Sequence, residues 1–292
     1  MAANTRDIRR RIKSVKNTSQ ITKAMQMVAA AKMRKAQNAA LAGRPYADLL
    51  RKVLGSLAGK NTEEKHALLE QRDVKKELVL VISTDKGLCG ALNTNLFREV
   101  AKFDSAKTEF VVVGRKAMQY LGRAGRTVLA DFQLKENLHF LEAKQVSKFC
   151  MDKFTSGEVD KVTVVFTDFV NTLTQVPRVR TVLPITSLDV GDVLTSADHK
   201  IAAPENTTEY MFEPDAASVL AGVLPHYVHF QVYQMILDCR ASEHSARMVA
   251  MKNATDNAKQ LIKDLTLEYN KVRQAAITTE ILEISTAQIA LG

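Results

Sequence analysis

The sequence predicts an α/β protein in which a long antiparallel coiled coil of the N- and C-terminal helices adjoins a small domain with a mainly parallel sheet. Residues 1–42 contain no glycine or proline, and after Pro225 neither appears until the terminal Gly292. Between these ends, continuous apolar runs alternate with helical stretches. We expect a coiled-coil helix at residues 1–60, the α/β domain at 74–213 and a second coiled-coil helix at 214–292.

The N-terminal helix would be about 60 Å long, so it needs a partner helix to pack against. Its apolar residues follow the alternating spacings of four and three that line a coiled-coil seam. They are Ile8, Ile12 and Val15, followed after a polar interruption at residues 17–19 by Ile21, Met25 and Val28.

Charge is concentrated in the same helix. Ten basic residues and one acid lie between Arg6 and Lys35, a local excess of nine that equals the net charge of the whole chain. Such a basic segment predicts an acidic partner, which can be nucleic acid, an anionic membrane surface or an acidic protein. A helix face that is merely solvated is the alternative.

The central residues predict a Rossmann-like domain. Apolar runs at residues 77–83, 108–114 and 161–167 are typical of strands buried on both faces. Helical stretches at residues 94–103, 116–122 and 141–156 separate them, which favours a parallel sheet. Residues 176–185 contain Pro177 and Pro184, so we expect an edge strand or an extended connector there. Residues 208–212 form a possible last short strand.

The C-terminal helix is expected to open at Pro214–Asp215, with a possible kink at Pro225. Two seams follow, the second in a shifted register. The first comprises Ile262, Leu265, Tyr269, Val272 and Ala276, and the second Ile277, Ile281, Ile284 and Leu291. Beyond Arg273 the only charged residues are Glu280 and Glu283, so this apolar tip is expected to sit inside a partner.

Candidate chemistry is sparse. The loop at residues 85–90 follows a strand and precedes a helix, but it lacks both phosphate-binding glycine patterns, so a tight packing turn is favoured. Gly122–Gly125 reads as a helix C-cap turn. Three widely spaced cysteines argue against disulfides, and nothing places a base beside Cys89. His226 and His229 make only a weak metal site. We therefore expect no catalytic residue, no cofactor and no metal.

Five blocks of the sequence resemble one known family, the gamma subunits of F-type ATP synthase. In chain order they are residues 21–35 (ITKAMQMVAAAKMRK), 85–93 (DKGLCGALN), 209–215 (EYMFEPD), 241–252 (ASEHSARMVAMK) and 265–283 (LTLEYNKVRQAAITTEILE). The resemblance runs from end to end. It implies a non-catalytic rotor shaft whose coiled coil sits within a hexamer of alpha and beta subunits. It further implies that the α/β domain meets the epsilon subunit and the c-ring.

The resemblance also implies contacts for individual residues. Met25 matches a position near an acidic lever loop of the beta subunit. Arg273 and Gln274 match a pair that meets a catch loop of the beta subunit, and Thr278 and Glu280 match positions coupled to Met25. The foot facing the c-ring is matched by Tyr210, Phe212 and Glu213. Residues 285–288 (STAQ) depart from the Ser-Gly-Ala segment usual in the family.

The chain has no run of about 20 apolar residues. With no leader-like segment, this predicts a peripheral protein on the cytoplasmic face of a bacterial inner membrane. No inserted cysteine pair is present, so thiol control is not expected. A basic coiled coil that binds nucleic acid is the competing class, although its basic segment lacks stacking aromatic residues. A thiol or phosphate-binding enzyme is a third class.

Overall fold

The computed structural model describes residues 5–43, 45–46, 49–50, 53, 66–136, 138–185, 212–213 and 215–291. These form two compact units. The coiled-coil unit contains the described residues up to Ala29 and from Met248 onward, and the α/β unit contains those from Ala30 to Arg247. Two long helices, α1 (Thr5–Ala42) and α6 (Ala216–Leu291), contribute residues to both.

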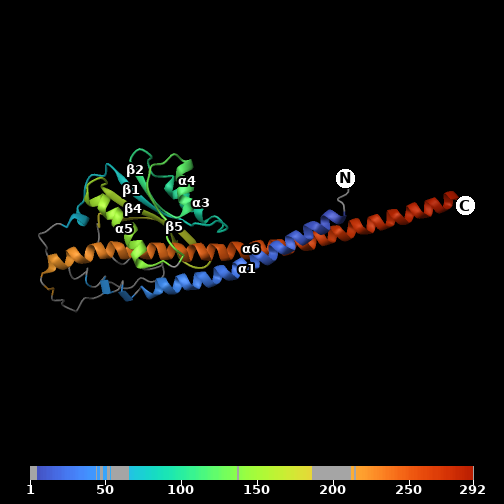
Figure 1. Ribbon diagram of the computed structural model, residues 1–292, viewed down its shortest axis with the longest axis horizontal. Coiled ribbons are helices and arrows are strands. Elements are labelled where there is room, and N and C mark those ends of the chain that lie inside the picture. Colours follow the sequence, from blue (N-terminus) through green and yellow to red (C-terminus); the bar gives the residue numbers. More distant parts are fainter. Residues whose placement is uncertain are drawn as a thin grey trace. The chain divides into compact units, whose positions relative to one another are not determined.

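In the coiled-coil unit α1 and α6 run antiparallel, as predicted (Figure 1). The Arg9 side chain donates a hydrogen bond to the Tyr269 hydroxyl at 2.5 Å. The hydroxyl oxygens of Thr22 and Thr255 lie 2.7 Å apart. From the first contact to the second, the chain advances 13 residues along α1 and goes back 14 residues along α6, as antiparallel helices require. In Figure 1, the red end of α6 continues past the start of α1.

The seam keeps one register along the whole unit. Its buried or half-buried positions on α1 are Ile8, Ile12, Val15, Ser19, Thr22, Gln26 and Ala29. Those on α6 are Met251, Thr255, Ala258, Ile262, Leu265, Tyr269 and Val272. Both sets keep alternating spacings of four and three, as in a coiled coil.

Two details of the predicted seam were therefore wrong. Ile21 and Val28 are exposed, because the register continues through the polar residues Ser19 and Thr22 without a shift. The threonine pair satisfies its buried hydroxyl groups across the seam, so a polar position does not interrupt the packing. On α6, Ala276 is exposed, whereas the other four residues predicted for the first seam face α1.

The α/β unit contains a five-stranded sheet. Its strands are β1 (Glu77–Ile82), β2 (Thr108–Val113), β3 (Val128–Phe132), β4 (Lys161–Phe169) and β5 (Gln175–Leu183). The order is β3-β2-β1-β4-β5, and only β5 pairs antiparallel. Strands β1 to β3 are added toward one side of the sheet and β4 is added on the other side of β1. The gap between β1 and β4 is therefore the topological switch point of a doubly wound fold.

Helices cover both faces of this sheet (Figure 1). One apolar core joins Val79 and Val81 to α3 (Leu92–Val100) and α4 (Arg115–Arg123). The other joins Leu78 and Leu80 to α5 (Phe140–Thr155) and the first part of α6. Alternate residues of β1 thus enter different cores, which explains its uninterrupted apolar sequence. A short 3-10 helix, η1 (Ala67–Leu69), adds Leu68 to the second core.

The predicted elements of this unit are largely confirmed. The three buried strands and three helices are present, and residues 175–183 form the expected edge strand. Strand β3 was missed, because two of its five side chains are exposed and it lacks a continuous apolar run. Of the possible strand at residues 208–212, only Phe212 is described, and it lies outside any strand. The domain limits at residues 60 and 213 remain predictions.

Helix α6 begins where the sequence indicated. The Asp215 carboxylate accepts hydrogen bonds from the Ser218 backbone N–H at 2.7 Å and from its hydroxyl at 2.8 Å. These bonds, the backbone one above all, lower the pKa of Asp215. Asp215 is thus an N-cap that satisfies an unpaired helix donor. The helix continues through Pro225 without ending.

Candidate partner-binding surfaces

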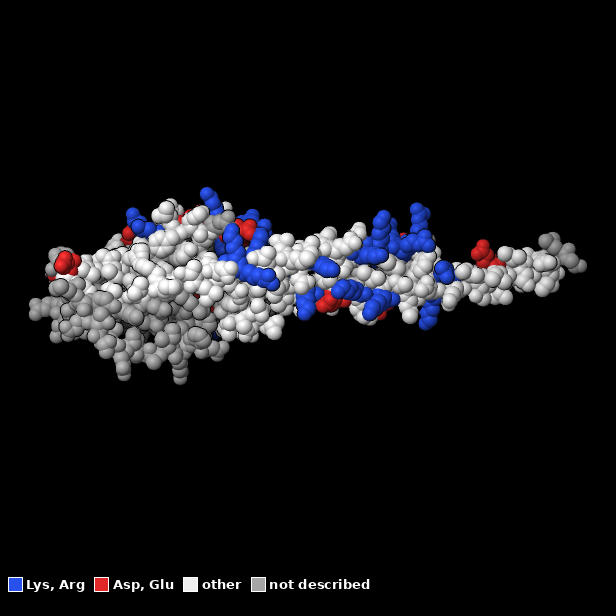
Figure 2. Space-filling model, turned by 90° about the horizontal axis from the view of Figure 1, so that it is seen from below, with Lys and Arg blue, Asp and Glu red and all other residues white. Residues whose placement is uncertain are grey.

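The last turns of α6 form an exposed apolar surface. Every side chain described from Arg273 to Ile289 is exposed, and we call this stretch the tip segment. Ile281 is 60% exposed and Ile284 is 63% exposed. Figure 2 shows this end of the coiled-coil unit as mostly white, with a small red patch. An apolar surface of this extent is typical of a segment that a partner covers.

The residues expected to meet the beta subunit lie on the coiled-coil unit. Met25 is half-buried on α1. Arg273, Gln274, Thr278 and Glu280 are exposed on the tip segment, within two turns of each other. The Thr278 hydroxyl donates to the Gln274 carbonyl at 2.9 Å, which leaves its oxygen available as an acceptor.

The expected foot residues are only partly described. Phe212 is half-buried and packs against the larger core of the α/β unit, whereas Glu213 is exposed. Tyr210 lies outside the described residues. Their assignment to a c-ring contact therefore stays a prediction.

The basic residues of the coiled-coil unit face solvent. Figure 2 shows lysine and arginine side chains gathered over the paired part of α1 and α6. Arg10 forms an exposed ion pair with Asp7 at 3.3 Å, and Arg9 stacks over the Tyr269 ring at 5.4 Å. An exposed ion pair of this kind contributes little to the stability of the unit.

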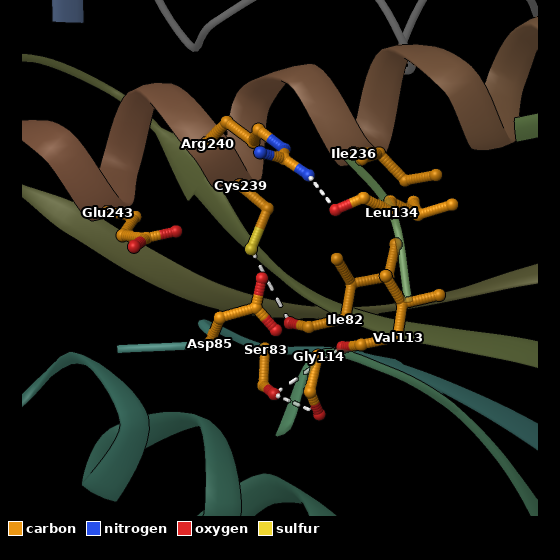
Figure 3. A pocket seen from close by; sticks show the side chains of 10 residues that line it. All are labelled: Ile82, Ser83, Asp85, Val113, Gly114, Leu134, Ile236, Cys239, Arg240 and Glu243. Carbon is orange, nitrogen blue, oxygen red and sulfur yellow. Dashed lines mark hydrogen bonds between the residues drawn. The ribbon is translucent and has the colours of Figure 1, made fainter. Parts of the chain in front are cut away.

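In the α/β unit, α6 fills the space at the carboxyl ends of the strands, which is where doubly wound folds bind ligands. The space beyond the ends of β1 and β2 is lined by Asp85, Gly114, Cys239, Arg240 and Glu243, among others (Figure 3). It encloses only about 20 Å³, room for about one water molecule. The thiol of Cys239 contacts the Ile82 carbonyl at 3.4 Å, and Arg240 donates to the Leu134 carbonyl.

The loop after β1 also caps α4, so the helix N-terminus is not available to a phosphate. The backbone N–H of Arg115 donates to the Asp85 carboxylate at 3.1 Å, and that of Ala117 to the Ser83 hydroxyl at 2.9 Å. Arg247 of α6 donates to the carbonyls of Lys86 and Gly87. The predicted tight packing turn is thus confirmed, and two carboxylates, Asp85 and Glu243, oppose anion binding there.

Gly114 makes this arrangement possible. Its φ angle is +98°, a conformation that side-chain-bearing residues rarely adopt. A Cβ atom there would lie 2.3 Å from the Ser83 carbonyl oxygen.

The second predicted turn, at Gly122–Gly125, is also confirmed as a helix C-cap. The backbone N–H of Arg126 donates a hydrogen bond to the Leu121 carbonyl at 3.1 Å.

None of the thiols is placed for catalysis. Cys89 is buried, and its pKa is raised by burial, although the nearby Arg247 opposes this. Burial raises the pKa values of Cys150 and Cys239 to about 12. A nucleophilic cysteine needs a lowered pKa, so these three side chains act as packing residues.

One serine–histidine pair was missed by sequence reasoning. Ser147 Oγ lies 2.7 Å from His229 Nδ1, although the residues are far apart in sequence. Both are buried, and the Ser147 hydroxyl also lies within hydrogen-bonding distance of the Ala143 and Lys144 carbonyls. Burial lowers the pKa of His229 to about 4, so the ring is neutral. With no access for a substrate, this pair joins α5 to α6 and is structural.

Among the residues that the structure describes, no cluster of three or more His, Cys, Asp or Glu side chains could hold a metal ion. No helix in the described part of the chain is long and apolar enough to cross a membrane.

Comparisons with known proteins match the chain over its whole length. The family model described as ATP synthase matches residues 4–291. The ATP synthase gamma chain of Methylacidiphilum infernorum is 51% identical over 296 residues, covering 99% of this chain and 100% of that protein. The gamma chain of Opitutus terrae is 51% identical over 293 residues, covering 99% of each.

Solved structures show the same fold. A chain in the central stalk and c-ring structure of the Tetrahymena thermophila mitochondrial ATP synthase is 26% identical, with a TM-score of 0.60. The match covers 80% of this chain and 99% of that one. A chain in the rotor of the Euglena gracilis mitochondrial enzyme is 20% identical, with a TM-score of 0.65 and coverage of 94% and 98%. By sequence and by fold, therefore, the chain belongs to the family of ATP synthase gamma chains.

Proposed function

We propose that this chain is the central-stalk rotor of a proton-translocating F-type ATP synthase, carrying torque between the membrane c-ring and the catalytic alpha/beta hexamer. The observation that carries the proposal is the tip segment, an apolar helix end that continues past the start of α1 with every described side chain exposed. Such a surface needs an apolar cavity around it, which we call the sleeve. A ring of subunits around the helix would supply this cavity.

The mechanical role follows from the local chemistry. Basic side chains on the coiled-coil unit attract acidic loops at a distance, and exposed charges do so without one fixed pair that would lock the shaft at one angle. Beyond Arg273 the tip segment carries only two charged side chains, Glu280 and Glu283, so an apolar sleeve can slide past it with few ionic contacts to break. Met25, Arg273, Gln274, Thr278 and Glu280 are the residues that we propose to contact beta-subunit loops.

We assign the chain no catalysis of its own, for two reasons. At the carboxyl ends of the strands α6 leaves room for about one water, and burial raises the pKa of the Cys239 thiol. Nucleotide chemistry would then belong to the alpha/beta hexamer. We also propose contacts with the epsilon subunit, and contacts of Tyr210, Phe212 and Glu213 with the c-ring. The chain would lie peripherally on the cytoplasmic face of a bacterial inner membrane.

Reconstitution tests this function. The full chain is mixed with the alpha and beta subunits of the same organism, and assembly and ATP hydrolysis are measured. We expect one complex that hydrolyses ATP, and lower torque per step when the chain is truncated after Arg273. Failure of the folded chain to co-assemble would overturn the rotor proposal. Sequence-specific binding of duplex DNA would instead support the nucleic-acid class, because salt-dependent binding alone is expected of any basic helix.

A further inference from the structure

A second, larger concavity lies elsewhere in the α/β unit, between α1, α6 and the segment that joins β3 to α5. It encloses about 490 Å³, within the range of sites that bind small molecules. We call it the cationic groove. Its apolar walls come from Ala36 and Ala39 of α1, Leu138 of the joining segment and Leu237 of α6.

Its charged groups are mostly cationic. Among the described residues that line it, Lys32, Lys35 and Arg240 are cations and Glu136 is a carboxylate, and two histidines, His139 and His244, also line it. The Lys32 ammonium pairs with the Glu136 carboxylate. Arg240 donates to the backbone carbonyls of Glu136 and Leu134, at 3.2 and 3.3 Å. A guanidinium has five N–H donors, and these two bonds leave others for a ligand.

A buried histidine at the groove has an unpaired nitrogen. His244 is only 8% exposed, and among the described residues its Nδ1 has no hydrogen-bond partner. A buried polar atom without a partner is costly, so its persistence here calls for an explanation. Burial first, and then the positive charges of Arg247 and Lys32, lower its pKa to about 4. The ring is therefore neutral near pH 7 and can donate one hydrogen bond to an anion.

We propose that the cationic groove binds an amphipathic organic anion, a carboxylate carried on a medium-length apolar body. The carboxylate would lie among His244 Nδ1, Arg240 and Lys32, and the apolar body would cover Ala36, Ala39 and Leu138. Inorganic phosphate fits less well, because it would leave the apolar walls of the groove in contact with water. A neutral apolar molecule would leave the His244 nitrogen without a hydrogen-bond partner.

Nuclear magnetic resonance of the full chain tests this site. The protein is labelled with ¹⁵N-histidine, and the His244 ring signals are assigned from a His244→Gln variant. Decanoate is then added below its micelle concentration. We expect a saturable shift of the His244 ring nitrogens with a Kd of about 1 mM or tighter, the value that modest ligand efficiency gives for a molecule of this size. The anion should also raise the pKa of His244, because it favours the protonated ring.

Two chain-length-matched ligands separate the anion from its tail. Decanol and decyltrimethylammonium carry the same apolar body with no charge or a positive charge, and should shift His244 at least tenfold less at equal concentration. Binding of any of these molecules to the exposed tip segment leaves the His244 signals unchanged. Equal shifts with all three ligands, or no shift with 10 mM decanoate, would overturn the proposal.

Matched variants locate the ligand. Ala39→Phe fills the groove and should weaken decanoate binding tenfold or more. Asn38→Phe adds the same ring at a neighbouring exposed position that does not line the groove, and should leave the Kd unchanged. Lys32→Gln should weaken binding severalfold. Unchanged His229 ring signals show that the unit remains folded in each variant. Equal affinity in Ala39→Phe and Asn38→Phe would contradict the assignment.

Discussion

Thr22 and Thr255 face each other across the buried seam of the coiled-coil unit, with their hydroxyl oxygens 2.7 Å apart. Thr22 Oγ1 also lies 3.1 Å from the Ser19 carbonyl, and Thr255 Oγ1 lies 2.8 Å from the Met251 carbonyl. Two hydroxyl protons serve three contacts, so one contact lacks a proton at any moment. Each threonine thus has a second partner in its own helix, and the pair couples the helices through one shared bond.

The threonine pair predicts a double-mutant cycle. Thr255→Val should lower the free energy of unfolding by about 1 kcal/mol, because Thr22 loses its cross-seam partner but keeps the Ser19 carbonyl. The double variant with Thr22→Val should recover at least part of this loss, since two matched apolar groups leave no buried hydroxyl unpaired. Urea unfolding of the full chain, followed by circular dichroism, measures both. Thr266→Val, at an exposed position of α6, is the control, and strictly additive losses would contradict the coupling.

Arg9 and Tyr269 predict a second effect, at the start of α1. Tyr269→Leu removes both the hydrogen bond and the ring beneath the guanidinium, whereas Tyr269→Phe removes only the hydrogen bond. We expect faster amide hydrogen exchange over residues 5–12 in the leucine variant, equivalent to about 0.5–1 kcal/mol, and a smaller change in the phenylalanine variant. Exchange that is identical in all three proteins would show that this contact does not hold the helix end.

His229 predicts acid sensitivity. Its pKa is lowered to about 4 by burial first, with further contributions from Lys144, His226 and Lys148. The unfolded chain has the ordinary value of about 6.5, so between these two values the unfolded state binds a proton that the native state does not. The free energy of unfolding should therefore fall as the pH drops from 6.5 to 4, by on the order of 2 kcal/mol.

Ring titration by nuclear magnetic resonance provides the check on His229. The native ring should titrate near pH 4, and in a His229→Gln variant the loss of stability between pH 6.5 and 4 should be smaller than in the parent chain. A midpoint above pH 6 would mean that solvent reaches the ring, and the prediction would be wrong.

Two glycines predict opposite outcomes for the same substitution. Gly114→Ala should lower the free energy of unfolding by several kcal/mol, because its Cβ would overlap the Ser83 carbonyl and its φ angle is positive. Gly122→Ala should be neutral or stabilising by up to about 1 kcal/mol. Gly122 lies within α4, and outside its own helix backbone and chain neighbours no heavy atom lies within 4 Å of the added Cβ. Thermal unfolding of both variants decides this, and equal stability of the two would refute the steric argument.

The tip segment predicts a face-specific effect on coupling. Ile281→Lys with Ile284→Lys should impair assembly or reduce ATP hydrolysis at least tenfold, because a sleeve would bury two uncompensated charges. Thr279→Lys with Thr286→Lys adds the same charge on the opposite face of the helix and should be tolerated better. Both are measured in the reconstituted complex. If the Ile281→Lys, Ile284→Lys variant assembles and hydrolyses ATP at the wild-type rate, the sleeve interpretation is wrong.

Much of the fold followed from patterns of apolar residues. The buried strands β1, β2 and β4 lie in two cores at once, so their continuous apolar runs were unambiguous. Strand β3 was not predicted, because its side chains alternate between half-buried and exposed and only its pairing with β2 makes it a strand. The same limit applied to Ile21 and Val28, whose exposure depends on which helix face meets α6.

The sequence by itself determined the helical ends, the parallel sheet, the basic segment and the family, because these depend on residue type and spacing along the chain. Only the tertiary structure decided that Thr22 meets Thr255, that Ser147 meets His229 and that Lys32 shares a groove with His244. It also decided that α6 fills the edge of the sheet where a ligand could have bound. Such contacts join residues more than eighty positions apart, and spacing along the chain carries no information about which distant side chains packing will bring together.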